Sequence, residues 1–109
     1  MTDGRHAVCE DLSLELHRAV ARRLLEEPVL LERARQRVSA WLRDGSVARS
    51  YAEAWQAILA APAEEAASAL VDPGERARQL RQTSPFAGFL EPRMRWAIWR
   101  RARRQAPQA

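Results

Sequence analysis

Aromatic, apolar and arginine side chains suited to binding gather in residues 81–104 of the 109-residue sequence. Pro85 and Pro92 bracket an apolar loop, residues 86–90, in which Gly88 can adopt a positive φ. A loop with two phenylalanines and a leucine must be buried, either in the core of its own chain or against a partner. The chemistry that this stretch predicts is therefore binding.

Tryptophans and arginines of the same stretch complete a predicted partner-binding set. The sequence has four tryptophans with arginines around them, a composition favoured at interface hot spots. The apolar residues would be anchors and the arginines charged contacts, in a set made of Phe86, Phe89, Leu90, Arg93, Arg95, Trp96, Trp99 and Arg100. On this hypothesis, Phe86→Ala or Arg95→Glu weakens a complex without unfolding the domain. The alternative is that the tryptophans fill the protein's own core, as we expect for at least two of the four.

Histidine and cysteine residues form no catalytic or metal-binding signature in the sequence. His6, Cys9 and His17 are conceivable metal ligands, but no Cys-x-x-Cys motif or histidine pair completes a site. His17 has no serine or cysteine partner in an organised loop, and phosphate-binding loops and dinucleotide fingerprints are missing. We therefore predict that the protein is not an enzyme and has no metal or cofactor.

The positive charge is concentrated at the C-terminal end. The formal net charge is +4, and residues 92–109 contain six arginines and no acid. The alternative function is therefore a nucleic-acid-binding transcriptional regulator that uses the basic last helix, since arginines neutralise phosphates and tryptophans stack on bases. Two considerations count against it. Trp96 and Trp99 would serve the apolar face of that helix, and arginines near a helix C-terminus complement its dipole.

Length and composition favour a single domain in the cytoplasm of a bacterium. The hydrophobic fraction of 47% supports a core, and no apolar run approaches the ~20 residues of a membrane span. The N-terminus lacks the hydrophobic region of a secretory signal, and a single cysteine fits a reducing compartment. All 18 basic residues are arginine, which indicates a GC-rich genome rather than selection for phosphate binding.

Apolar periodicity predicts an all-α fold, a compact orthogonal bundle of about five to six short helices. Leu12, Leu16 and Val20 recur every four residues, which marks one face of a helix. No segment alternates as a strand would. Prolines and capping residues divide the chain into helices over residues 11–27, 28–44, 50–61, 62–71, 72–82 and 92–104. The first two helices are expected to form an antiparallel hairpin.

Local signals also predict where helices and the domain begin and end. Asp11 or Ser13 would cap the first helix, Ser50 would open a capping box, and Asp72 would cap a later helix. The predicted organisation is a flexible N-terminus over residues 1–10, one helical domain over residues 11–104, and a disordered tail over residues 105–109.

The segment Leu80-Arg-Gln-Thr-Ser-Pro-Phe-Ala-Gly-Phe-Leu-Glu-Pro-Arg, followed by Trp96-Ala-Ile, resembles a family of small all-helical bacterial proteins. Its members show an R-Q-[ST]-S-P-F-A-G-x-L pattern before a final tryptophan-containing helix. The segment Tyr51-Ala-Glu-Ala-Trp55 is also similar, so the resemblance covers about residues 12–100.

The resemblance implies a partner as well as a fold. Such proteins are encoded in compact gene pairs of the kind that includes toxin–antitoxin modules. This chain would be the antitoxin-like member, which binds and neutralises a larger partner protein, its cognate toxin. Many antitoxins add a DNA-binding segment for autoregulation, and no such segment is evident in this sequence. A second copy of the chain is the other protein partner expected.

Overall fold

Six α-helices make up the part of the chain that the structure describes. The computed structural model describes the backbone of residues 4–105 and the side chains of residues 12–104. The helices are α1 (Gly4–Glu26), α2 (Val29–Asp44), α3 (Arg49–Leu59), α4 (Ala63–Leu70), α5 (Glu75–Arg81) and α6 (Pro92–Gln105). Residues 4–105 contain no strand, so the predicted all-α fold is confirmed. No helix in this described range is long and apolar enough to cross a membrane.

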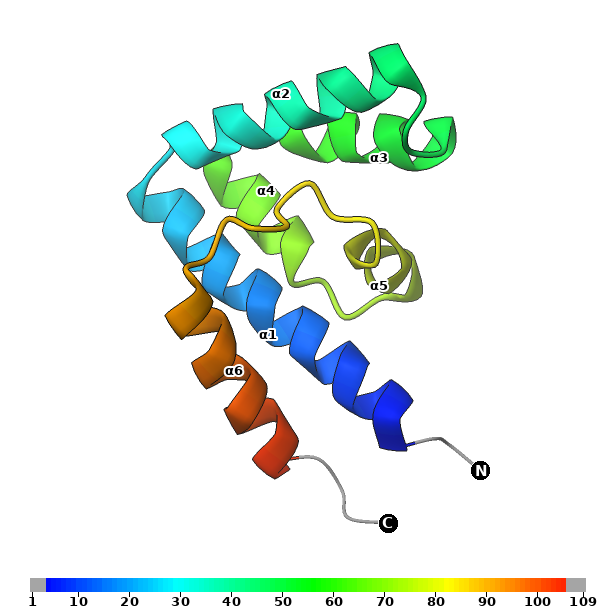
Figure 1. Cartoon of the computed structure of the whole chain (residues 1–109). Helices are drawn as coiled ribbons and strands as arrows, with labels where there is room; N and C mark the ends of the chain where they lie inside the picture. Colours follow the sequence, from blue (N-terminus) through cyan, green and yellow to red (C-terminus); the bar gives the residue numbers. More distant parts are fainter. Residues whose placement is uncertain (1–3, 106–109) are drawn as a thin grey trace.

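α1 is the central helix of the bundle (Figure 1). α4 and α6 pack against it, whereas α2 crosses its C-terminal end and packs along α3. α1 and α2 have few contacts with each other, so the predicted antiparallel hairpin of these two helices is wrong. Pro28 joins them and allows the change of direction, and each helix then buries its apolar face against a different neighbour.

The first helix begins earlier than its predicted caps. α1 starts at Gly4 rather than at Asp11 or Ser13, so the backbone of residues 4–10, which was expected to be loose, is helical. The reason is that no proline or glycine interrupts the chain between Gly4 and the end of the helix. Most of the predicted disordered tail, residues 106–109, lies outside the described residues.

Two predicted helix caps make other contacts. α3 begins at Arg49 without a side-chain cap, and Glu53 accepts a hydrogen bond from Arg49 Nε at 2.7 Å instead of completing a capping box with Ser50. Asp72 Oδ1 accepts the backbone N–H of Gly74 at 2.7 Å. Asp72 thus shapes the turn before α5 rather than capping the helix directly.

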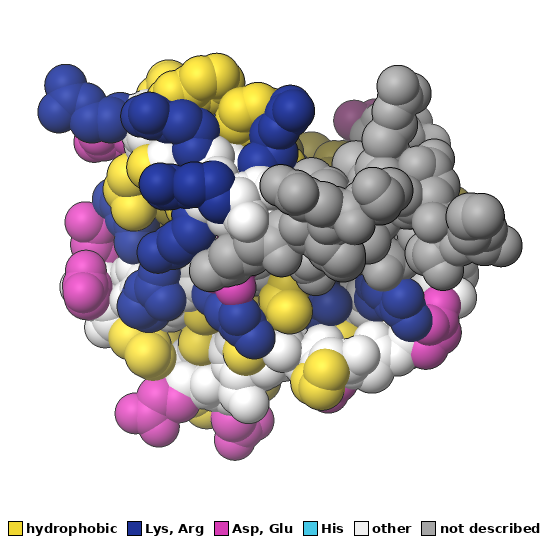
Figure 2. Space-filling model, turned by 90° about the horizontal axis from the view of Figure 1, so that it is seen from below, with side chains coloured by type: hydrophobic (Ala, Val, Ile, Leu, Met, Phe, Trp, Pro, Cys, Tyr) yellow, Lys and Arg dark blue, Asp and Glu magenta, His cyan; other side chains and the backbone are white. Residues whose placement is uncertain are grey.

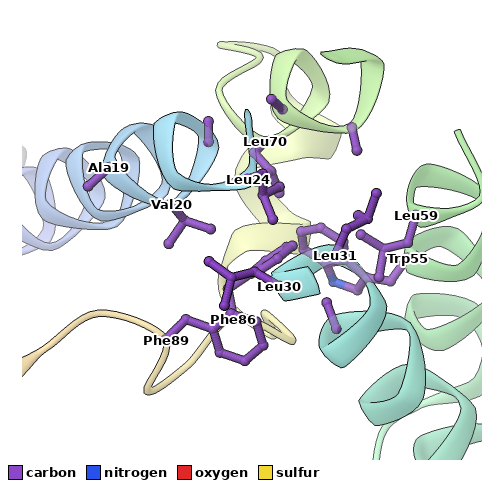
Figure 3. Close-up of a cluster of buried hydrophobic side chains, with 14 of the residues drawn as sticks. Ala19, Val20, Leu24, Leu30, Leu31, Trp55, Leu59, Leu70, Phe86 and Phe89 are labelled. Atoms are coloured by element: carbon purple, nitrogen blue, oxygen red, sulfur yellow. The ribbon is translucent and has the colours of Figure 1, made fainter. Parts of the chain in front are cut away.

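The core gathers residues from the helices and from the α5–α6 loop, residues 82–91. Trp55 of α3 is 1% exposed and Leu24 of α1 is completely buried. Figure 3 shows Phe86 and Phe89 of the loop beside Leu30, at the edge of the buried cluster. The indole Nε1 of Trp55 donates a hydrogen bond to the loop carbonyl of Thr83 at 2.7 Å. The loop is therefore part of the core rather than a peripheral connection.

Candidate functional site

The predicted apolar anchors lie in the protein's own core. Phe86, Phe89 and Leu90 are 4%, 7% and 5% exposed. The Phe86 ring meets the rings of Trp55 and Phe89 edge to face, with centroid distances of 6.1 and 5.3 Å. These three residues were predicted to be apolar anchors for a partner, and the structure places them in the protein's own core instead. The α5–α6 loop packs against α1, α2 and α3, because Phe86 contacts His17 and Trp55 and Phe89 contacts Arg37.

Arginines of α2 hold this loop in place. Arg37 Nη1 donates hydrogen bonds to the carbonyl oxygens of Pro85 and Ala87, both at 2.8 Å. The guanidinium groups of Arg33 and Arg37 lie 4.9 and 5.1 Å from the ring centroid of Phe89. These two arginines are not among the residues predicted from the sequence to form a site. Their spacing of four residues on one helix face was the available signal.

The remaining predicted residues form an exposed surface on α6. The α6 surface is defined here as Arg93, Met94, Arg95, Trp96, Trp99 and Arg100. Trp96 is 56% exposed and Met94 is 37% exposed, whereas Trp99 is partly buried. The two indole rings stack, with centroids 4.9 Å apart and an interplanar angle of 13°. Ile98 and Ala102 form the buried face of the helix instead, so the core does not need Trp96.

Positive charge surrounds the stacked indoles. The guanidinium of Arg100 lies 5.8 Å from the ring centroid of Trp96, and that of Arg103 lies 5.0 Å from the ring centroid of Trp99. Within the described residues, the sole α6 arginine near a carboxylate is Arg101, whose Nη2 is 3.9 Å from Glu15 Oε2. Figure 2 shows arginine side chains beside exposed apolar ones on the side of the molecule that α6 forms.

A shallow hollow of about 350 Å³ runs beside these tryptophans, between α6 and α1. It is lined by Leu12, Leu16, Pro92, Arg95, Trp96 and Trp99. The α6 surface therefore combines an apolar depression, a stacked pair of indoles with one ring exposed, and cations without carboxylate partners among the described residues. The five predicted residues of α6 therefore lie together on one surface. The three predicted residues of the loop are buried and do not belong to that surface.

A second cavity, of about 500 Å³, lies between α1 and the α5–α6 loop, with His17 and Ser84 in its wall. His17 Nδ1 lies 2.7 Å from the Ser13 carbonyl oxygen, and His17 Nε2 lies 2.8 Å from Ser84 Oγ. The prediction that His17 has no serine partner in an organised loop is therefore wrong. The two residues are 67 positions apart, and no local pattern reveals the pair.

Burial sets the charge state of this histidine. His17 is 6% exposed. Burial lowers the pKa of His17 below 6.5; the bond to Ser13 raises this pKa by less than burial lowers it, and the nearby cation of Arg81 adds a smaller decrease. Arg81 is itself buried, and its Nη1 donates to the carbonyl oxygens of Leu70 and Asp72 at 3.1 and 2.8 Å. His17 is therefore neutral at pH 7.

Neither metal-binding residues nor comparisons with known proteins indicate a function. Among the described residues, no three histidine, cysteine, aspartate or glutamate side chains gather in a way that could hold a metal ion. The side chains of His6 and Cys9 lie outside the described residues. Comparisons with protein-family models, with curated proteins and with solved structures find no match.

Proposed function

We propose that this chain is a protein-binding module, an antitoxin-like protein that binds and neutralises a partner toxin through the α6 surface. The observation that carries the proposal is the exposure of Trp96, 56% of whose surface is open to solvent while its ring is stacked on Trp99. A large, rigid indole gives up little conformational entropy on binding and buries a large apolar area. The resemblance of residues 80–93 to antitoxin-like proteins supports the choice of partner.

The charges of the α6 surface indicate the chemistry of that partner. Arg93, Arg95 and Arg100 are exposed, and none of them has a carboxylate partner in the described part of the chain. A partner with carboxylates around an apolar projection would match both the arginines and the hollow beside Trp96. We therefore propose that an acidic surface of the partner toxin binds α6. The complex would form in the cytoplasm of a bacterium.

Co-expression of the chain with the product of its neighbouring gene tests this proposal. The complex is purified through a tag on this chain, its mass is measured by light scattering, and its affinity by calorimetry. We expect a stoichiometric complex that Trp96→Ala or Arg100→Glu weakens roughly tenfold or more. Val29→Ala is the matched control, because Val29 is an apolar residue of α2 that is 64% exposed and lies outside the α6 surface.

Two outcomes would contradict the proposal at different levels. If the neighbouring product does not co-purify, the antitoxin-like role fails. If it co-purifies but Trp96→Ala, Arg100→Glu and Val29→Ala all bind like the wild type, the complex uses another surface. Phe86→Ala is not a useful probe of the interface, because Phe86 is a core residue.

Nucleic-acid binding is a second candidate function, favoured by the exposed ring of Trp96 among arginines. One consideration against it, that the core needs both tryptophans, does not apply to Trp96. Fluorescence anisotropy with single-stranded and double-stranded oligonucleotides at several salt concentrations separates the two functions. Phosphate contacts lose affinity steeply as salt rises, whereas an apolar interface loses little. Light scattering of the chain alone detects the other protein partner, a second copy.

A further inference from the structure

His17 and Ser84 have the geometry of a base beside a nucleophile. The distance of 2.8 Å between His17 Nε2 and Ser84 Oγ is in the range required for proton transfer. The bond of His17 Nδ1–H to the Ser13 carbonyl fixes the tautomer, so that Nε2 presents its lone pair to the serine. The backbone carbonyl takes the orienting role that a carboxylate has in a Ser-His-Asp triad.

Other contacts hold the pair in this arrangement. The backbone N–H of Phe86 donates to Ser84 Oγ at 3.1 Å, which leaves the hydroxyl proton of Ser84 directed to His17. The Phe86 ring meets the His17 ring edge to face, with centroids 6.5 Å apart. A buried, neutral histidine can accept a proton at pH 7, and Ser84 is partly exposed. The serine is therefore reachable while its base is shielded from water.

The adjoining cavity can hold an apolar substrate next to Ser84. Its volume of about 500 Å³ lies in the range of small-molecule sites. Its apolar wall is formed by Leu12, Leu16, Val20, Phe86 and Leu90, and Arg95 lies at the same cavity. This distribution suits an uncharged, largely apolar acyl group.

The loop after Ser84 also supplies hydrogen-bond donors. Ala87 and Gly88 line the cavity, and their backbone N–H groups make no hydrogen bond within the described residues. Gly88 has φ of +83°, a left-handed conformation that favours glycine. These two N–H groups and the Arg95 cation line the same cavity as Ser84, and they are donors of the kind that stabilise an oxyanion.

We propose that Ser84 is a nucleophile activated by His17, and that the cavity takes the apolar acyl group of a carboxylic ester. Ser84 Oγ bonds to the ester carbonyl carbon while its proton passes to His17 Nε2. The carbon–oxygen bond to the alcohol breaks, and the alcohol leaves with that proton. Water then attacks the acyl-serine and gives a proton to His17. That proton returns to Ser84 Oγ as the carboxylic acid leaves.

Arg95 belongs to both the cavity and the α6 surface, whereas Ser84 and His17 lie outside that surface, so variants of Ser84 and of Trp96 test the two proposals separately. It revises the expectation of a non-enzyme, because that expectation depended on His17 having no serine partner, and the observed hydrogen bond removes this ground. A purely structural role, in which the bond only fixes the α5–α6 loop to α1, is the competing explanation. The experiment must therefore detect chemistry at Ser84 rather than stability.

The test combines a covalent probe with a chromogenic ester. The full-length protein is treated with an alkyl fluorophosphonate, the adduct is located by peptide mass spectrometry, and hydrolysis of p-nitrophenyl butyrate is followed in parallel. We expect one adduct, on Ser84, and ester hydrolysis that Ser84→Ala abolishes. His17→Gln should slow both reactions about 100-fold or more. Ser68→Ala, a change at an exposed serine of α4, should leave both rates unchanged.

The pH profile distinguishes a catalytic base from a structural histidine. The charged groups that line the cavity near His17 are Arg81 from α5 and Arg95 from α6, and its described lining contains no carboxylate. Burial, and after it the cation of Arg81, lowers the pKa of His17, so the labelling rate should persist below pH 6.5 and fall as the histidine becomes protonated. This profile is measured on the wild type and does not depend on any variant folding.

The outcomes that overturn the proposal are specific. A folded wild type that forms no adduct on Ser84 refutes it, and so does a labelling rate that never falls as the pH is lowered below 6.5 over the range in which the protein stays folded. Circular dichroism checks the fold of each variant. If His17→Gln folds and reacts as fast as the wild type, His17 is not the base. If either site variant fails to fold, the wild-type adduct and its pH profile decide.

Discussion

The Phe86 side chain illustrates how one residue of the α5–α6 loop stabilises the whole bundle. Its ring is 4% exposed and lies edge to face with His17, Trp55 and Phe89. We expect Phe86→Ala to lower the free energy of unfolding by about 3–5 kcal/mol, because it leaves a cavity and removes these ring contacts. Urea denaturation followed by circular dichroism measures this loss.

The matched control for this prediction is another aromatic residue. Trp96→Ala should lower the free energy of unfolding by roughly 1 kcal/mol or less, because most of its surface is already in water. Equal losses for the two variants would show that the burial difference between the loop and α6 does not hold in solution.

His17 should make stability depend on pH. Its pKa in the folded state is lowered by burial, so the unfolded chain binds a proton at a higher pH than the folded chain does. The stability that neutral His17 contributes is therefore complete above pH 6.5 and is lost as pH falls through the lower folded pKa. We expect the free energy of unfolding to decrease as the pH falls below about 6.5.

Urea titrations of the wild type and His17→Gln at several pH values check this dependence. The difference between the two proteins removes the contribution of every other titrating group. It should shrink as pH falls, since protonation penalises only the histidine. A difference that is constant with pH would mean that His17 is as easily protonated in the folded state as in the unfolded state.

At the scale of elements, α2 controls the position of the α5–α6 loop through Arg37. This side chain satisfies two carbonyl oxygens of the loop and lies against the Phe89 ring. We expect Arg37→Ala to lower the free energy of unfolding by about 2 kcal/mol, because hydrogen bonds from a charged donor are lost and the carbonyls remain. Arg43→Ala, at an exposed position of the same helix, should change it by about 0.5 kcal/mol or less. Similar values for the two variants would contradict a specific anchoring role.

Individual helices were predictable because their signals are local. The four-residue spacing of Leu12, Leu16 and Val20 indicated α1, and Gly45 ends α2 with φ of +71°, as expected for a glycine stop. Pro92 begins α6, as predicted. Helix pairing was not predictable in the same way, because an apolar stripe shows that a helix is covered without identifying the covering element. The hairpin of α1 and α2 was predicted wrongly because the apolar stripe of α1 does not show which helix covers it.

At the scale of the whole molecule, the division between core and surface was only partly predictable. The sequence of the apolar loop is compatible with burial in its own core and with burial against a partner. Which of the two occurs depends on how helices distant in the sequence pack around the loop. Trp55 is buried and Trp41 packs partly against the core, whereas Trp96 is exposed. Composition alone treats the three alike. The contact of His17 with Ser84 likewise exists only after the chain has folded.

The attachment of α6 to the rest of the bundle has a consequence for motion. α6 packs mainly against α1, through a narrow face that includes Ile98 and Ala102, whereas α1 and α3 each pack against several helices. A helix held on one side opens by local unfolding at a lower free energy than the global transition. Its backbone amides should therefore exchange with deuterium faster than those of α1 and α3. A partner that binds the α6 surface would stabilise the folded helix by mass action and so slow this exchange. The slowing would extend to α6 amides that the partner does not contact.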